Sequence, residues 1–304
     1  MKQRKLIFLS VFIIVVSSVA CSIAGCGVVR GSGRVIEEER HVSSFSQVSL
    51  TNSANLYIEN GDEEALRVEA EDNLLPYLET YVSGDTLVLK TRHGVSLQPS
   101  QAIKFYLTVK ELDSVNASGN GAVFAPDMQG RDIYLKTSGS GDIQAGTLVA
   151  KTINLKTTGS GGIKTGILTA EDIKMETTGS GDFDLAGGKT ETLDVFISGA
   201  ARVNLGELEA EQVKVKITGS GKMTVSSGEI DRQDITITGS GYYYAGDMLS
   251  RRANVSISSS GEVTVQAQDK LEAMLTGSGD VYYIGHPAIV QQETGSGGVY
   301  QREK

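Results

Sequence analysis

Apolar and polar residues alternate through most of residues 116–304. Residues 153–157, 173–177 and 213–217 each place an apolar or threonine side chain at every second position. A period of two is typical of a β-strand with one buried face. A second alternating stretch follows each of these, and its equivalent inward positions are Ile143, Phe183, Val203, Met223, Tyr243, Val263 and Val281. The pattern predicts short strands, with no room between them for a helix of useful length.

The motif Ser/Thr-Gly-Ser-Gly separates these stretches at a fixed spacing. Ser259 takes the place of its first glycine once, and two steps of 18 residues then lead to Gly277 and Gly295. Before that point the first glycine recurs every 20 residues, at Gly119, Gly139, Gly159, Gly179, Gly199, Gly219 and Gly239. Units this short cannot bury a core alone, whereas stacked coils pair their strands and align like residues in columns.

We therefore predict an all-β fold, a right-handed parallel β-helix (solenoid) with about 20 residues per coil and rungs about 4.8 Å apart. A left-handed solenoid would need hexapeptide repeats, which the sequence does not contain. An antiparallel sandwich is the main competing architecture.

Columns of equivalent residues predict how the coils pack. The position two before the first glycine points inward, giving a threonine ladder from Thr137 to Thr177 and an aliphatic stack from Ile197 to Leu275. We interpret the serines between the glycines as marking a corner too tight for larger side chains. Because Ser259 and Ala201 each replace a motif glycine once, a positive φ in every coil is not expected.

Residues 34–115 are less regular than the repeats that follow. Alternating segments predict strands near residues 50, 57, 67, 88 and 106, and residues 73–79 fit one helical turn. A solenoid needs its open ends covered, because an exposed edge recruits other chains. We therefore predict that residues 34–115 form irregular first coils and an N-terminal cap, continuous with the regular repeats of residues 116–304.

The N-terminus predicts export. Three cations, Lys2, Arg4 and Lys5, precede an apolar run over residues 6–16. That run is too short to span a bilayer as a helix, but it fits the core of a signal peptide.

Cys26 follows Ile23-Ala24-Gly25, a segment that resembles the lipobox of bacterial lipoproteins. The resemblance implies cleavage before Cys26 and acylation of its thiol, with residues 1–25 as signal peptide and residues 26–33 as lipidated cysteine and flexible tether. Cys21 is the rival acceptor, and a plain secretory signal or an uncleaved anchor are the other possibilities. The expected location is the cell envelope, with the body outside the cytoplasm and the lipid in the outer membrane if the cell is Gram-negative.

Cleavage there would change the formal net charge from −9 to −12, because residues 1–25 contain three cations and no acid. So acidic a body argues against nucleic acid as a partner and against peripheral docking on anionic lipid. With Cys26 acylated, no free thiol would remain for a disulfide or a thiolate metal site.

The apparent catalytic and metal-binding motifs of the sequence lack required residues or spacing. Gly219-Ser220-Gly221-Lys222 hints at a phosphate loop, but the required first glycine and the hydroxyl residue after the lysine are both missing. The three histidines do not recur with any serine of the repeat, so a catalytic triad is not expected. Calcium at Glu262 and Asp280 would be unusual, since glycine-aspartate calcium solenoids use a nine-residue repeat. We expect no catalytic residues, no metal site and no cofactor.

Tyrosines provide the candidate binding residues. Tyr244, Tyr282 and Tyr300 share one outward position of the repeat, and Tyr242 lies on the same side. Such tyrosines could hold sugar rings or a partner surface. The alternative is ordinary packing between rungs.

Several segments together resemble one known family. These are Phe45–Leu50, Asp72–Leu75, Gly84–Leu87 and the repeats that follow, after an exported N-terminus. Over roughly residues 34 to 300 the chain is similar to the bacterial head GIN domain family of auto-transporter adhesin-like proteins. The resemblance implies a right-handed β-helix in the cell envelope and provides no catalytic residues.

The leading functional hypothesis is therefore a non-enzymatic envelope lipoprotein with an adhesin-like or scaffolding role. Its expected partners are its membrane, through the lipid anchor, and a glycan or an envelope protein. The rival is a polysaccharide lyase or hydrolase on a similar β-helix. That rival needs long loops around a cleft, for which the uniform 20-residue spacing leaves little room.

Overall fold

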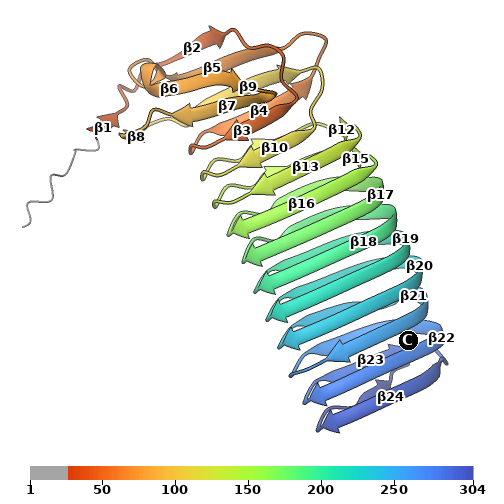
Figure 1. Ribbon diagram of the computed structural model, residues 1–304. Helices are drawn as coiled ribbons and strands as arrows, with labels where there is room; N and C mark the ends of the chain where they lie inside the picture. The colour runs from red at the N-terminus through yellow and green to blue at the C-terminus, as the bar shows by residue number, and fades with distance from the viewer. Residues whose placement is uncertain (1–26, 304) are drawn as a thin grey trace, which may run out of the picture.

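The computed structural model describes residues 27–303, which form a rod of stacked coils with a small group of strands over its N-terminal end (Figure 1). The predicted signal peptide and Cys26 lie outside the described residues. The all-β parallel solenoid with about 20 residues per coil is confirmed, and the coils wind in the right-handed sense. No helix in residues 27–303 is both long and apolar enough to cross a membrane.

The regular coils begin after residue 113, and equivalent positions pair in parallel. For example, Ile163 pairs with Phe183, which in turn pairs with Val203. The strands are β10 (Ser114–Ala117), β11 (Val123–Phe124), β12 (Met128–Gln129), β13 (Asp132–Thr137), β14 (Ile143–Gln144), β15 (Leu148–Val149), β16 (Thr152–Gly159), β17 (Ile163–Gly179), β18 (Phe183–Gly199), β19 (Arg202–Gly219), β20 (Lys222–Gly239), β21 (Tyr242–Ile257), β22 (Glu262–Gly277), β23 (Asp280–Ile284), β24 (Ala288–Gly295) and β25 (Val299–Gln301).

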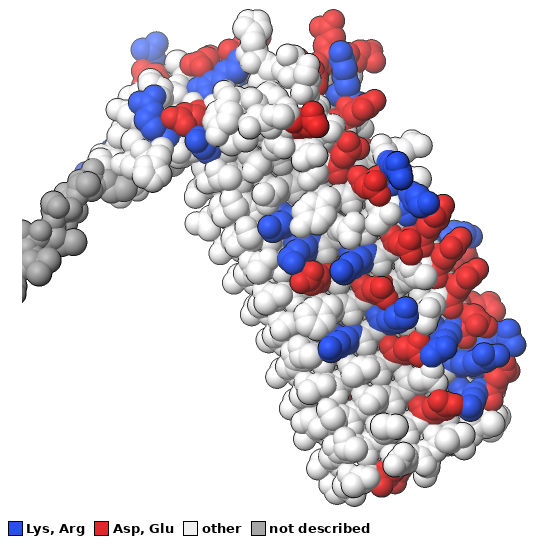
Figure 2. Space-filling view, in the orientation of Figure 1, with Lys and Arg blue, Asp and Glu red and all other residues white. Residues whose placement is uncertain are grey.

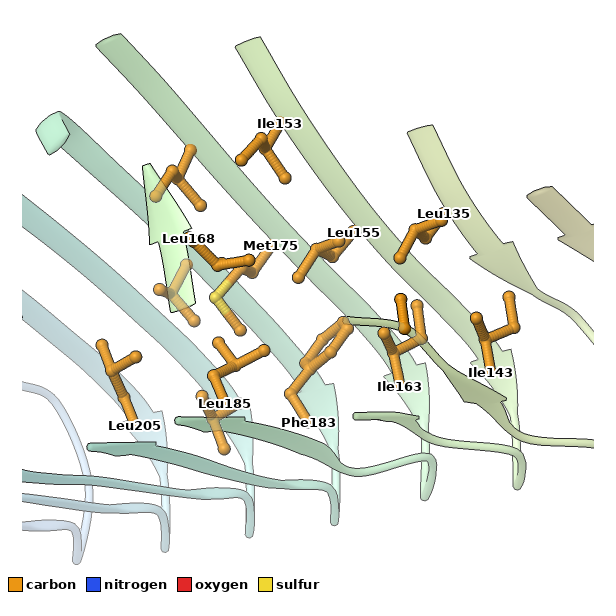
Figure 3. Close-up of a cluster of buried hydrophobic side chains, with 14 of the residues drawn as sticks. Leu135, Ile143, Ile153, Leu155, Ile163, Leu168, Met175, Phe183, Leu185 and Leu205 are labelled. Atoms are coloured by element: carbon orange, nitrogen blue, oxygen red, sulfur yellow. The ribbon is translucent and has the colours of Figure 1, made fainter. Parts of the chain in front are cut away.

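Inward columns form one continuous core. Side chains from opposite walls of each coil meet at the axis, as Leu155 and Met175 do with Ile163 and Phe183 (Figure 3). All four are almost fully buried, and burial of such a side chain contributes roughly 1.5–3 kcal/mol. The predicted inward positions are therefore confirmed.

The threonine ladder is buried as predicted and satisfies its own hydroxyls. The Thr157 Oγ1 atom donates to Thr177 Oγ1 at 2.9 Å, and Thr137 Oγ1 donates to the Gly141 carbonyl at 2.7 Å. Each hydroxyl of this ladder thus has a hydrogen-bond partner, which avoids the cost of desolvating an unpaired polar group.

The corner motif packs differently from the prediction. Seven of its first glycines have φ between 128° and 152°, a region that favours glycine, while Gly119, Gly139 and Ser259 do not. A Cβ atom on Gly199 would lie 2.3 Å from the Gly179 carbonyl oxygen. The positions that leave no room for a side chain are therefore those of the glycines. The interpretation of the serines was wrong, because Ser160, Ser180 and their equivalents are exposed to solvent.

The first rung of the solenoid comes from the N-terminal region. There β3 pairs in parallel with β10, and β4 pairs in parallel with β11. On the other side of this rung, β7 and β9 continue the stack, and β6, β5 and β2 add antiparallel pairs. This region comprises β1 (Gly27–Arg30), β2 (Val35–Arg40), β3 (Gln47–Leu50), β4 (Asn55–Asn60), β5 (Ala65–Glu71), the 3-10 turn η1 (Leu75–Tyr77), β6 (Leu78–Ser83), β7 (Thr86–Thr91), β8 (Val95–Gln98) and β9 (Lys104–Val109).

Residues 27–33 are not a flexible tether, so that prediction is corrected. β1 pairs in parallel with β8, and the Ser32 amide donates to Asn73 Oδ1 at 2.9 Å. The Glu71 carboxylate is buried behind this segment. It accepts hydrogen bonds from the Gly33 amide at 2.6 Å and from the Ser100 hydroxyl at 2.6 Å. These contacts hold the segment on the cap.

The last described coil has polar residues at inward positions that are apolar in the preceding coils. Gln291 and Glu293 of β24 stand next to Ala273 and Leu275 of β22, and Gln301 of β25 stands next to Tyr283. Polar side chains at inward positions discourage another strand from stacking on an open edge. The last described coil therefore has polar side chains along its open edge, whereas the N-terminal end of the rod is covered by strands.

We expect the Glu71 contacts to make stability depend on acid pH. The Ser100 hydroxyl, opposed by burial and assisted by the Gly33 and Ser100 amides, holds the pKa of Glu71 below its ordinary value of 4.5. A lowered folded-state pKa contributes stability that is present above the unfolded-state pKa, about 4.3, and is lost as the pH falls through the folded-state value. The midpoint temperature of thermal unfolding should therefore be lower for Glu71→Gln than for wild type at neutral pH.

That difference should shrink as the pH falls through the folded-state pKa of Glu71. The matched control is Glu39→Gln, which removes an exposed carboxylate of β2 and should track wild type throughout. A gap between Glu71→Gln and wild type that stays constant from neutral pH to about pH 3 would contradict this account.

Candidate binding surfaces

The predicted tyrosines lie together near the C-terminal end of the rod. Tyr244, Thr264, Tyr282 and Tyr300 occupy successive rungs of one outward column. The rings of Tyr282 and Tyr300 have centroids 5.7 Å apart, and Tyr242 stacks on Tyr244 at 6.3 Å. We call Tyr242, Tyr244, Tyr282 and Tyr300 the tyrosine patch. The shared position of Tyr244, Tyr282 and Tyr300 is confirmed, and the binding role of the patch stays a prediction.

Cations fix the orientation of the tyrosine patch. The Lys222 Nζ atom lies 4.8 Å from the ring centroid of Tyr244, and the Arg302 guanidinium lies 3.4 Å from that of Tyr282. Cation–π contacts of this kind are each worth about 0.5–1 kcal/mol at exposed sites. Burial raises the pKa of Tyr244, and the nearby Glu262 carboxylate adds to that shift. The patch is therefore a preorganised aromatic surface.

A buried polar network supports the tyrosine patch from beneath. The Tyr243 hydroxyl donates to Gln233 Oε1 at 3.0 Å, and Gln233 Nε2 donates to Ser250 Oγ at 2.8 Å. The Ser250 hydroxyl donates in turn to the Gln266 carbonyl at 2.7 Å. All three side chains are fully buried, and burial raises the pKa of Tyr243. The network lies where the register between β21 and β22 shifts.

A second aromatic cluster occupies the same outward column at the N-terminal end, and the sequence analysis missed it. Tyr57 stacks on Tyr106 at 5.3 Å and on Phe124 at 5.0 Å. The Arg67 guanidinium covers the other face of Tyr106 at 4.2 Å. The rings of Tyr57 and Tyr106 line a groove of about 550 Å³ on the cap. Both residues are flanked by apolar neighbours, which is the only local signal. Their pairing spans 49 residues and follows no repeat.

Charged side chains of opposite sign are interleaved over the coils (Figure 2). Asp182 and Arg202 form an ion pair across rungs at 3.2 Å. Similar pairs join neighbouring rungs at Lys151–Glu171, Lys156–Glu176, Lys164–Asp184 and Lys189–Glu209. Exposed pairs of this kind contribute little to stability individually, so their main effect is to balance charge along each column.

Four carboxyl groups in residues 27–303 have a displaced pKa, and in all four it is lowered: Glu69, Glu71, Asp72 and Asp234. None of these four has the raised pKa that a glycosidase acid needs. In Asp234, burial raises the pKa, but hydrogen bonds from Asn254, Arg232 and Gln212 outweigh it. Glu262 and Asp280 do pair across rungs, but the described residues contain no group of three potential metal ligands.

The fold and these surfaces define a class of protein, a β-solenoid that presents its chemistry on outward columns. The chain belongs to the family described as "Putative auto-transporter adhesin, head GIN domain", whose model matches residues 44–227 and 207–287. The family expected from the sequence is thereby confirmed. No curated protein matches the chain.

Solved structures similar to this chain include two from Parabacteroides species. A "putative adhesin" of Parabacteroides merdae shares 20% identity and a TM-score of 0.52, covering 91% of this chain and 99% of the other. A "putative lipid binding protein" of Parabacteroides distasonis shares 24% identity and a TM-score of 0.48, covering 90% and 99%. The first of these likenesses supports the solenoid fold.

Tyr243→Phe should destabilise the protein by about 1–3 kcal/mol, because it leaves Gln233 Oε1 buried without a donor. Urea unfolding measures this loss. The matched control is Tyr242→Phe, which removes the same hydroxyl from an exposed ring and should change the free energy of unfolding by less than about 0.5 kcal/mol. Equal effects of the two substitutions would show that the buried network does not stabilise this region.

Proposed function

We propose that this chain is a non-enzymatic, adhesin-like binding protein of the cell envelope, anchored by a lipid on Cys26. The tyrosine patch is the observation that carries the proposal. It is a fixed, outward-facing aromatic surface, and Tyr300 is 49% exposed. Tyrosine combines a large apolar face with a polar tip, which suits sugar rings and protein surfaces alike. The proposed partner is a glycan or an envelope protein, and nucleic acid is not proposed because the body is acidic.

The arrangement of the rod supports this role. Gly27, the residue after the proposed acceptor, begins β1 on the cap, whereas the tyrosine patch lies at the opposite end (Figure 1). The rungs between them extend on the order of 45 Å, at about 4.8 Å per rung. Because β1 is held against β8, little slack separates the cap from an anchored lipid. The cap would therefore face the membrane and the tyrosine patch would face away from it.

The rival enzyme on a glycan has weaker support. Its cleft would need loops that leave the coils, but β17 to β20 follow one another at 20-residue spacing with continuous pairing. The repeat therefore favours binding along a surface over catalysis in an enclosed site. Turnover of any polysaccharide by the purified protein would favour the rival.

Replacement of Tyr244, Tyr282 and Tyr300 by serine should weaken binding to glycans or envelope proteins at least tenfold, since each ring supplies about 1 kcal/mol or more of contact. A glycan array and pull-downs from envelope extracts with residues 27–304 measure this. Tyr134→Ser is the matched control, because Tyr134 is an exposed tyrosine of the other wall. Unchanged binding by the triple variant would remove the tyrosine patch from the proposal.

Cys26→Ala should release the full-length protein from the membrane fraction and abolish incorporation of a labelled fatty acid. Cys21→Ala is the control for the rival acceptor and should leave both properties intact. Retention of the label in Cys26→Ala, with loss in Cys21→Ala, would move the anchor to Cys21.

A further inference from the structure

One charged column near the C-terminal end contains three consecutive bases. Arg232, Arg252 and Lys270 are direct partners on three successive rungs, β20 to β22. They line a groove of about 480 Å³ together with Asn254, Asp269 and Glu272. Like charges placed directly opposite one another in a sheet are destabilising, so the packing of the rod alone gives no reason for three bases here.

The flanking acids do not neutralise this column evenly. Arg232 pairs with Asp234 at 2.8 Å, and Lys270 pairs with Glu272. The side chain of Arg252, between them, makes no ion pair or hydrogen bond within the described part of the chain. The position two residues beyond it is Asn254, where the neighbouring rungs have acids. The middle of the column therefore has an uncompensated guanidinium flanked by two further cations.

In the adjacent column, by contrast, the arginine is neutralised by acids on both neighbouring rungs. Arg251 lies next to Arg252 in the chain and binds acids on both neighbouring rungs, Asp231 at 3.2 Å and Asp269 at 3.2 Å. Those two acids are therefore engaged with Arg251. Acids also stand at the equivalent position of the preceding repeats, 20 residues apart, at Glu171, Glu191, Glu211 and Asp231. At physiological ionic strength, interactions between exposed charges fall off over about 8 Å. The acidic body as a whole consequently does not cancel the local field at Arg252.

We propose that Arg232, Arg252 and Lys270 form a binding site for an acidic oligosaccharide, a sugar chain with carboxylate or sulfate groups. The inference rests on the proposed binding role and names a ligand class for a second surface. Guanidinium groups bind such oxyanions through paired hydrogen bonds. Three cations at about 4.8 Å per rung extend roughly 10 Å along the rod axis, which suits a chain better than a single ion.

The position of the site favours a glycan over the headgroups of the anchoring membrane. The three residues lie on coils near the end remote from Gly27 (Figure 1). They also lie in a different column from the tyrosine patch, so substitutions can separate the two surfaces.

The test is titration of the chain, residues 27–304, with polygalacturonate, dextran sulfate and neutral dextran, followed by calorimetry. Wild type should bind one or both acidic chains more tightly at low salt and should not bind neutral dextran through this site. Arg252→Gln should lower that affinity roughly tenfold to a hundredfold, the effect of losing one charge-assisted contact. The difference between the two acidic chains identifies the oxyanion as carboxylate or sulfate.

Arg251→Gln is the matched control, because it removes the same charge one residue away from an arginine that is already paired. It should change the affinity less than about threefold. Equal losses in Arg251→Gln and Arg252→Gln would overturn the proposal, as would failure of wild type to bind either acidic chain. Binding of anionic lipid vesicles with the same dependence on Arg252 would also overturn it. The serine variant of the tyrosine patch should retain acidic-chain binding, so the two proposals can fail independently.

Discussion

Parallel pairing between successive coils is the constraint on which the rest of this structure depends. A strand position can hydrogen-bond to the coil before and the coil after only if all three have the same local geometry. Each residue is therefore fixed by its partner 20 residues away, as Ile163, Phe183 and Val203 illustrate. Inward columns become aliphatic stacks or a threonine ladder, and the glycines at the corner let neighbouring backbones approach. The core is continuous because no coil can bury its apolar side chains alone.

The two ends of the described rod differ in what lies on their open edges. At the N-terminal end β3 and β4 form one rung, β7 and β9 extend it by parallel pairing, and the parallel pattern stops there. Antiparallel strands β2, β5 and β6 follow, and buried Glu71 holds the incoming segment against them. At the other end the backbone pattern persists, but Gln291 and Glu293 replace apolar residues at inward positions. One end is covered by strands, and the other is made polar.

Side chains can vary between coils on the outward columns, and aromatic and charged residues are unevenly distributed along them. Aromatic residues occupy one column near both ends of the rod, with Tyr57 at one end and Tyr300 at the other. Ion pairs balance most charged columns, but the column through Arg252 is not balanced. A rigid rod keeps these surfaces at fixed distances from one another and from the cap. This geometry suits a protein that displays binding surfaces, as expected of a member of an adhesin-like family.

The sequence alone determined the solenoid, its coil length, its inward columns and the shared position of Tyr244, Tyr282 and Tyr300, because each is written as a repeat at fixed spacing. Only the tertiary structure decided features that break the period. Tyr57 meets Tyr106 through a pairing inside the irregular cap, the segment after Gly27 is held by Glu71, and Gln233 meets Tyr243 and Ser250 at a register shift. Periodicity identifies the partners of a residue in advance, whereas contacts outside the repeat depend on how the whole chain packs.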